Sequence, residues 1–412
     1  RSRATTLYQE AAGDSEWGVA ASNGLASSLT EDGNNEEAIA VLEAGLDAAP
    51  NHLSLVDTTS QAYVEAGRLS EAEKVTSAAL AAFDGEGWAY GSHARVLLAK
   101  GNAAKAVAEL DRAVELSPGD ASLYALRGDA TRKVGSNDEA RESYEKALAL
   151  DLAQPRALSG FATLLIDMGN FDRAAEVLKQ MDDAKVHDLR ADEQRVRYLV
   201  LTGAGQSGMS TMRNAISRHP KNVALRLEGA RVALQAEDYV RAGTYYQQAK
   251  RNGADPRLAD TALALAQLYG RRKLGAENSL ERALEAVDAD GNRLTASPQV
   301  QVWELVVRAR LALANEKRGL AVRYAGQALQ IMPDDADVHL LRADIEEDRE
   351  RSPEGPLRKA ANAAVSMPVA AGRLSVLLGP TKEGCEMAAH YLKANRSGKL
   401  ASRARDLRRK CQ

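Results

Sequence analysis

The sequence predicts an all-α protein, a solenoid of about ten helix-turn-helix units that stack in series. Two observations on the whole chain lead to this fold class. Aromatic residues make up only 4% of the 412 residues while alanine is abundant, and this composition favours closely packed helices over strands. Glycine also recurs every 34 residues, with apolar residues repeating around it at the same period. These glycines are Gly33, Gly67, Gly101, Gly135, Gly169 and Gly203.

Each of these glycines is expected to end the first helix of a unit. The chain must reverse there, and glycine adopts the left-handed conformation of such a turn without steric cost. Five residues further on, a small residue lets the second helix approach the first closely. In the first five units this residue is Ala38, Ala72, Ala106, Ala140 and Ala174. Pro50, Pro118 and Pro220 end three second helices, because proline cannot continue a helix.

This pattern resembles the tetratricopeptide repeat (TPR), of which residues 119–151, GDASLYALRGDATRKVGSNDEARESYEKALALD, are a good local example. The resemblance covers residues 19–256 as seven regular units, and in the seventh Glu237 replaces the glycine. It implies a right-handed α-α superhelix that acts as a protein-binding scaffold, without catalytic activity and without a cofactor.

The rest of the chain is expected to consist of less regular units. Residues 1–18 place Ala4, Tyr8 and Ala11 where a second helix has its core, so they are expected to belong to a preceding, truncated repeat. The alternative is that they form an atypical cap. Residues 257–301 are expected to form an irregular, longer repeat with a loop at 288–293. Residues 302–335 return to the regular pattern, residues 336–368 form a degenerate repeat, and residues 369–412 supply C-terminal capping helices.

The segment Leu199–Gly208 carries a G-x-G-x-x-G pattern, which raises the alternative of a dinucleotide-binding turn. That turn needs a strand feeding a helix, whereas Gly203 lies on the 34-residue period of the helix pairs. The segment is therefore interpreted as a turn between helices. The six histidines also lack ligand spacing, and no catalytic motif occurs, so neither a metal nor an enzyme is expected.

The resemblance implies that the first helices line a concave groove, and in the third to seventh units basic residues predominate there. Acidic residues at such positions are Asp129, Asp167 and Glu193. A partly basic groove would bind a partner protein or peptide with an acidic segment. The alternative is that these arginines simply cover solvated helix faces. The basic groove residues are Arg95, Arg132, Lys133, Arg156, Arg190, Arg197 and Arg231.

Two tryptophans, Trp88 and Trp303, occupy the same early position in their units. A tryptophan in a groove is a good anchor for an apolar side chain of a partner. The alternative is that each wedges between neighbouring repeats.

Two cysteines, Cys385 and Cys411, lie 26 residues apart, a separation that suits two facing positions of a helical hairpin. A disulfide would staple the last helix onto the stack and would indicate an oxidising compartment such as the periplasm. The alternative is a pair of buried thiols in a reducing cytoplasm.

The last helix is basic and would suit phosphate, lipid headgroups or an acidic protein, or would simply be solvated. No stretch of eighteen apolar residues occurs, so membrane contact is expected to be peripheral at most. The net charge of -3 and the lack of interleaved aromatic residues argue against nucleic acid. The basic residues are Lys399, Arg403, Arg405, Arg408, Arg409 and Lys410.

The strong use of alanine and arginine resembles bacterial TPR proteins from GC-rich genomes. Such proteins often assemble envelope machines, including pilus and motility complexes, polysaccharide export systems, and polar complexes that engage a small GTPase. Two alternatives stay open. The array could instead be the arm of a larger protein with an upstream catalytic domain, or a membrane-surface adaptor that works through its basic last helix.

Overall fold

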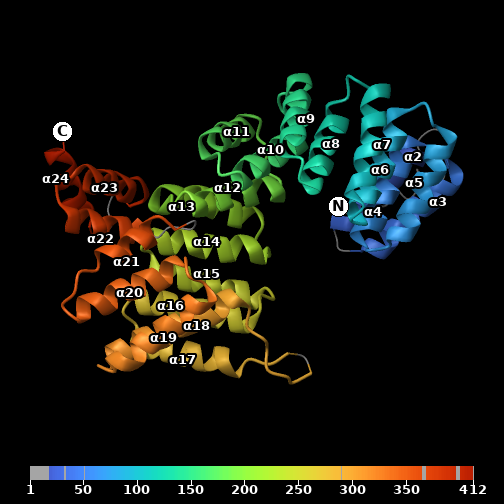
Figure 1. The fold of residues 1–412 in the computed structure, drawn as a ribbon. Helices are drawn as coiled ribbons and strands as arrows, with labels where there is room; N and C mark the ends of the chain where they lie inside the picture. The colour runs from blue at the N-terminus through green and yellow to red at the C-terminus, as the bar shows by residue number, and fades with distance from the viewer. Residues whose placement is uncertain are drawn as a thin grey trace. The chain divides into compact units, whose positions relative to one another are not determined.

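The computed structural model describes residues 18–31, 34–50, 52–288, 290–363, 368–395 and 400–411. Helices account for nearly all of these residues, and an isolated bridge between Val287 and Arg293 is their only β pairing (Figure 1). The expected helix within residues 1–18 and the first periodic glycine, Gly33, lie outside the described residues. The predicted all-α fold is confirmed, and the chain forms two compact units, Arg1–Val186 and His187–Gln412.

The N-terminal unit, Arg1–Val186, contains five antiparallel helix pairs among its described residues. They are α2 (Gly18–Glu31) with α3 (Asn35–Ala48), α4 (Leu53–Glu65) with α5 (Leu69–Ala82), α6 (Gly87–Ala99) with α7 (Ala103–Leu116), α8 (Ala121–Val134) with α9 (Asn137–Leu150), and α10 (Pro155–Asp167) with α11 (Phe171–Asp183).

The C-terminal unit, His187–Gln412, contains six pairs and a last single helix among its described residues. The pairs are α12 (Leu189–Leu201) with α13 (Gly205–Arg218), α14 (Val223–Gln235) with α15 (Tyr239–Arg251), α16 (Pro256–Tyr269) with α17 (Lys273–Glu285), α18 (Pro298–Ala314) with α19 (Arg318–Ile331), α20 (Ala336–Asp348) with α21 (Glu354–Ala361), and α22 (Pro368–Leu378) with α23 (Lys382–Ala394). The single helix is α24 (Ala401–Lys410).

The periodic glycines end first helices in the left-handed conformation, as the sequence predicts. After α8, Gly135 has a φ of 94° and donates its N–H to the carbonyl of Arg132. The period continues without glycine at Glu237 and Arg271, whose φ angles are 58° and 60°. A left-handed turn costs a non-glycine residue about 1 kcal/mol, so packing of the pairs rather than the turn residue sets the repeat. The other periodic glycines in this conformation are Gly67, Gly101, Gly169 and Gly203.

Residues 257–301 contain a helix pair of ordinary length, α16 with α17. The additional residues lie in the loop 286–297 that follows α17, and the next helix, α18, has 17 residues. The backbone N–H of Asp288 donates to the carbonyl of Asn292, and its carboxylate accepts the N–H groups of Asp290 and Asn292. This loop therefore has a folded turn of its own.

Small residues on facing helices make room for large ones, and Tyr144 in the N-terminal unit shows how tightly. Its ring is fully buried between Gly128 of α8 and Gly160 of α10. A Cβ atom at either glycine would lie 2.6 Å from the ring. The Tyr144 hydroxyl donates to Asp129 at 2.7 Å, so the buried polar group is satisfied.

The C-terminal unit closes on itself, because α23 returns to pack against α13 and the end of α14. Tyr391 donates to the carboxylate of Glu237 at 2.7 Å, and the side-chain amide of Asn395 donates to the carbonyl of Gln235 at 2.7 Å. A Cβ at Gly205 would lie 2.8 Å from the carbonyl oxygen of Ala394. The G-x-G-x-x-G segment is therefore a turn between α12 and α13 whose second glycine admits the backbone of α23.

Cys385 and Cys411 form a disulfide that joins α23 to the end of α24, with their Cα atoms 6.2 Å apart. Helix α24 buries one apolar face against α23, and Leu407 contributes its side chain to that contact. The backbone N–H of Leu400 donates to the Tyr391 hydroxyl at 3.2 Å. The closing helix α23 and the terminal helix α24 are thus held together by a covalent bond, an apolar contact and a shared tyrosine.

Candidate protein-binding cavity

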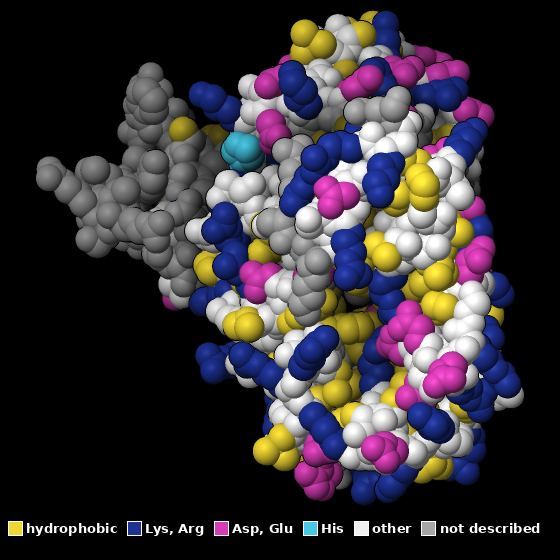
Figure 2. All heavy atoms as spheres, turned by 90° about the vertical axis from the view of Figure 1, so that its left-hand side faces the viewer, with side chains coloured by type: hydrophobic (Ala, Val, Ile, Leu, Met, Phe, Trp, Pro, Cys, Tyr) yellow, Lys and Arg dark blue, Asp and Glu magenta, His cyan; other side chains and the backbone are white. Residues whose placement is uncertain are grey.

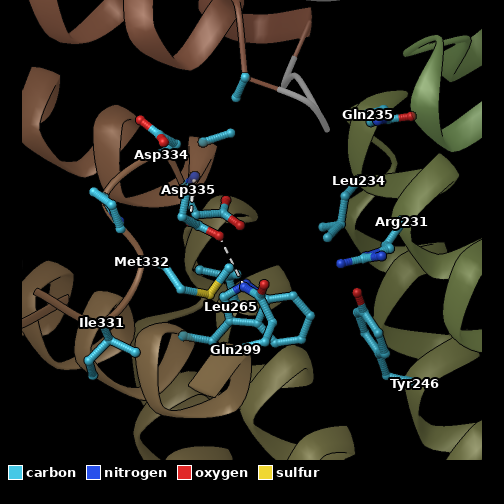
Figure 3. A pocket seen from close by; sticks show the side chains of 15 residues that line it. Arg231, Leu234, Gln235, Tyr246, Leu265, Gln299, Ile331, Met332, Asp334 and Asp335 are labelled. Carbon is cyan, nitrogen blue, oxygen red and sulfur yellow. Dashed lines mark hydrogen bonds between the residues drawn. The ribbon is translucent and has the colours of Figure 1, made fainter. Parts of the chain in front are cut away.

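The closed C-terminal unit contains a cavity of about 420 Å³. It is lined by the first helices α14, α16, α18 and α20, by Tyr246 of α15, and by the turn between α19 and α20 (Figure 3). Cavities of this size and mixed lining are typical of ligand sites, which are usually about 300–1,000 Å³. The cavity is the candidate site because it joins aromatic, cationic and anionic side chains from repeats that are far apart in sequence.

One wall carries a cation over an aromatic ring. Arg231 of α14 points into the cavity (Figure 3). Its guanidinium nitrogen lies 3.3 Å from the carboxylate of Glu228, and its guanidinium carbon lies 5.8 Å from the centre of the Trp303 ring. Trp303 is only 8% exposed, and its indole N–H has no acceptor among the described residues. A buried donor without an acceptor costs roughly 1–3 kcal/mol, so this wall is poised to donate a hydrogen bond.

The opposite wall is acidic. Asp335 caps α20 by accepting the N–H groups of Asp337 and Val338, and its other oxygen accepts from the amide of Gln299 at 3.0 Å (Figure 3). Asp337 accepts a hydrogen bond from the Tyr269 hydroxyl. Asp334 is exposed at the rim, and it has no hydrogen bond or ion pair with another described residue.

Burial and the neighbouring charge of Asp335 raise the pKa of Asp337 to about 6, against the opposing influence of Tyr269 and Arg310. Arg310 lies over the ring of Tyr269, 4.8 Å from its centre, and forms an ion pair with Asp344. Its positive charge is therefore shared between carboxylates, and the acidic wall keeps an excess of negative charge.

The predicted basic residues of the N-terminal unit are mostly paired with carboxylates. Three of them are in ion pairs that join neighbouring first helices, so their positive charge is compensated locally. Lys133 is exposed and lies 3.4 Å from the carbonyl of Leu98. The three pairs are Arg95 with Asp57 at 2.5 Å, Arg132 with Asp167 at 3.8 Å, and Arg156 with Asp129 at 2.9 Å.

The other predicted site residues belong to two places. Arg197 and Arg231 line a smaller cavity of about 310 Å³ together with Glu193, and half-buried Arg190 lies on the first turn of α12. Trp88 is half-buried in the N-terminal unit, where its ring centre lies 5.2 Å from that of Phe83. Of the two tryptophans, Trp303 lines the candidate cavity.

The basic residues of α24 are exposed, and Arg409 pairs with Asp406 at 2.9 Å on the same helix. Lys399 lies outside the described residues. Figure 2 views the molecule from the side on which α22–α24 lie in Figure 1 and shows Lys and Arg side chains spread over this face, with acidic and hydrophobic side chains between them. The positive charge on this side is therefore dispersed.

Among the residues with a described structure, no helix has the length and apolar character needed to cross a membrane. Nor do they contain a group of His, Cys, Asp and Glu side chains that could hold a metal ion.

Two models of the tetratricopeptide repeat family match the chain, one at residues 132–193 and the other at residues 1–52, 58–121 and 210–256, and together they cover more than half of it. A TPR protein from Parabacteroides merdae has a similar structure, with 17% identity over 64% of this chain and 99% of that one and a TM-score of 0.43. A thermophilic TPR protein of Thermus thermophilus is 20% identical over 52% of this chain and 99% of its own, with a TM-score of 0.36.

Cellulose synthase operon protein C of Xanthomonas axonopodis pv. citri is 28% identical over 157 residues, which are 36% of this chain. The chain spans about a tenth of the length of this curated relative. The helix pairs, the 34-residue turns and the matches to the family lead to one conclusion. The chain belongs to the tetratricopeptide repeat family, whose members generally bind other proteins and are typically not catalysts.

Proposed function

We propose that this chain is a non-catalytic scaffold that binds a segment of a partner protein in the cavity of its C-terminal unit. The observation that carries the proposal is the lining of that cavity of about 420 Å³, which combines Arg231 and Trp303 with Asp335 and Asp337. A concave site that is formed by stacked helix pairs binds by shape and by a few anchoring side chains. The partly buried tryptophan and the arginine beside it are residue types that often dominate such binding.

We place this scaffold in a bacterial envelope assembly, and among such assemblies in polysaccharide export. The similarity to a protein named for a cellulose synthase operon supports this setting. The disulfide between Cys385 and Cys411 supports an oxidising compartment, as the periplasm is. The match covers only 10% of that protein, so the alternative that this chain is the repeat-containing arm of a larger protein also stays open. No observation favours a small GTPase over other partners, and the proposal includes none.

The basic groove residues carry a separate prediction, that they bind an acidic segment of the partner. The ion pairs of Arg95, Arg132 and Arg156 weaken it, because their charge is already opposed. Changing Arg132, Lys133, Arg190 and Arg197 together to glutamate tests it. Loss of the captured partner would support an acidic segment, and unchanged capture would reject one.

A peripheral membrane role through α24 is the second candidate, since Arg403 and Arg408 are exposed. Flotation with vesicles that contain anionic lipid tests it, comparing the native chain with a variant in which Arg403, Arg405, Arg408 and Arg409 are changed to glutamate. Flotation of the native chain alone would support the membrane role, and no flotation of either protein would reject it.

The main proposal is tested by capture of the partner with two matched variants. Met332→Arg places a long charged side chain in the cavity, whereas Val287→Arg does so on the exposed loop after α17. We expect a partner that the native chain and the Val287→Arg chain both capture and that the Met332→Arg chain loses. Circular dichroism melts verify that both variants fold. Equal capture by both would contradict binding in the cavity.

A further inference from the structure

We infer that the cavity of the C-terminal unit receives a cationic side chain, an arginine or a lysine, from the bound partner segment. This inference rests on the proposed function and adds the chemistry of the segment that is recognised. It follows from the balance of charge around the cavity: among the described residues that line it, there is one cation and there are three carboxylates. These residues are Arg231, and Asp334, Asp335 and Asp337.

The single lining cation is already neutralised. Arg231 forms an ion pair with Glu228 on its own helix, and the flat face of its guanidinium is near the Trp303 ring. It therefore offers little net positive charge to an occupant. An acidic side chain in the cavity would instead face the carboxylates of the opposite wall, which is unfavourable in a partly buried site.

None of the three carboxylates forms an ion pair with another described residue. The partners of Asp335 are backbone N–H groups and the amide of Gln299, and the donor to Asp337 is the Tyr269 hydroxyl, so each hydrogen bond comes from an uncharged group. Asp334 has no such partner among the described residues.

Two further arginines of this unit are engaged in ion pairs outside the cavity lining. Arg310 and Arg373 both form ion pairs with Asp344, and Arg373 also pairs with Glu347 at 2.8 Å. Burial and the charge of Asp335 still raise the pKa of Asp337 to about 6, although Arg310 and Arg231 act in the opposite direction. Negative charge is therefore in excess on this wall, and an entering cation would relieve it.

The occupant has to come from outside the described chain. An arginine suits the site because its planar guanidinium can donate to two carboxylates at once, while a lysine would act as a point charge. Trp303 contributes its ring to the lining of the same cavity, beside Arg231.

The test uses the full chain and short blocked peptides, Ac-Ala-Arg-Ala-NH2 and its lysine, glutamate and leucine analogues, at up to millimolar concentration. The indole N–H signal of Trp303 in a ¹⁵N spectrum reports on the cavity, and a Trp303→Phe variant assigns it. We expect saturable shifts with the arginine and lysine peptides and none with the glutamate or leucine peptides. Equal shifts with the glutamate peptide, or no shift with any, would overturn the inference.

Asp334→Asn removes one carboxylate at an exposed position where no fold contact is lost. Asp290→Asn is the matched control, because it removes a carboxylate from the exposed loop after α17. We expect the Asp334→Asn change to lower the affinity for the arginine peptide about fivefold and the control to leave that affinity unchanged. Equal affinity in the Asp334→Asn and Asp290→Asn proteins would contradict the inference, provided that thermal melts show both folded.

The two levels of the proposal fail separately. If the partner is captured through the cavity but the peptides bind without regard to charge, the scaffold function stands and the cationic occupant is wrong. If the arginine peptide binds with the expected selectivity but no partner depends on the cavity, the site is cationic and the scaffold function is wrong.

Discussion

The disulfide between Cys385 and Cys411 should decide whether α24 stays folded on the C-terminal unit. Reduction, or the double change Cys385→Ser with Cys411→Ser, removes a covalent link across 26 residues of sequence. Closing a loop of that length lowers the entropy of the open chain by an amount worth about 3.5 kcal/mol at 25 °C. When the link is lost, the short helix keeps its apolar contact with α23 and the hydrogen bond from Leu400 to Tyr391.

Hydrogen exchange followed by mass spectrometry measures this locally. We expect exchange of peptides that cover residues 400–411 to accelerate by up to roughly 300-fold on reduction, the ratio that about 3.5 kcal/mol corresponds to. Peptides from α8 and α9 in the N-terminal unit serve as the internal reference and should not change. Equal protection of α24 in oxidised and reduced protein would refute the reasoning, since the noncovalent contacts would then hold the helix without the disulfide.

Three further predictions concern single side chains. Gly128→Ala should lower the free energy of unfolding of the N-terminal unit by about 1–3 kcal/mol, because its Cβ would meet the buried Tyr144 ring; an unchanged urea midpoint would contradict this packing. Tyr391→Phe should speed hydrogen exchange in α23 by removing about 1 kcal/mol of hydrogen bonding to Glu237, and unchanged exchange would show that closure does not depend on it. The pKa of Asp337 is raised to about 6, so its ionisation should cost the native protein stability as the pH rises from 4.5 to 7.5. Over that range the free energy of unfolding of Asp337→Asn should therefore increase relative to that of the native protein by roughly 1–3 kcal/mol. A pH-independent difference in urea unfolding would count against it.

Much of the helix arrangement was predictable because each 34-residue unit repeats the same local contacts. The left-handed turn at Gly135 and the close pairing around Tyr144 follow from residues within one unit and its neighbour. The turn at Arg271 keeps the same period, but it escapes a search for glycine because packing holds an arginine there in the left-handed conformation. Without a glycine at that turn, the additional residues before α18 suggest an irregular repeat in the sequence, although the pair α16 with α17 has ordinary lengths.

The cavity was predictable only in part. Arg231 and Trp303 are found from their positions in the repeat, because first helices face inward. The acidic wall depends on the turn before α20 and on closure of the unit, in which Tyr391 reaches Glu237 across 154 residues of sequence. No local pattern encodes such a contact.

The ion pairs of the N-terminal unit could have been anticipated from the same periodicity. Arg132 and Asp167 are 35 residues apart, close to one repeat, so they lie on neighbouring first helices. A count of basic residues in a groove therefore overstates the positive charge available to a partner. Each basic residue has to be checked for a carboxylate about one period away that would form an ion pair with it.

Site-specific photocrosslinking tests the central claim, that a partner protein binds in the cavity of the C-terminal unit, most directly. A benzoylphenylalanine replaces Met332 in the cavity or Val287 on the exposed loop, and each chain is irradiated in the native host. The account predicts one dominant crosslinked protein from position 332, lost when Asp334 and Asp337 are both changed to asparagine, and none from position 287. The same products from both positions would contradict the central claim, and a product from position 332 that persists in the asparagine variant would contradict the cationic occupant.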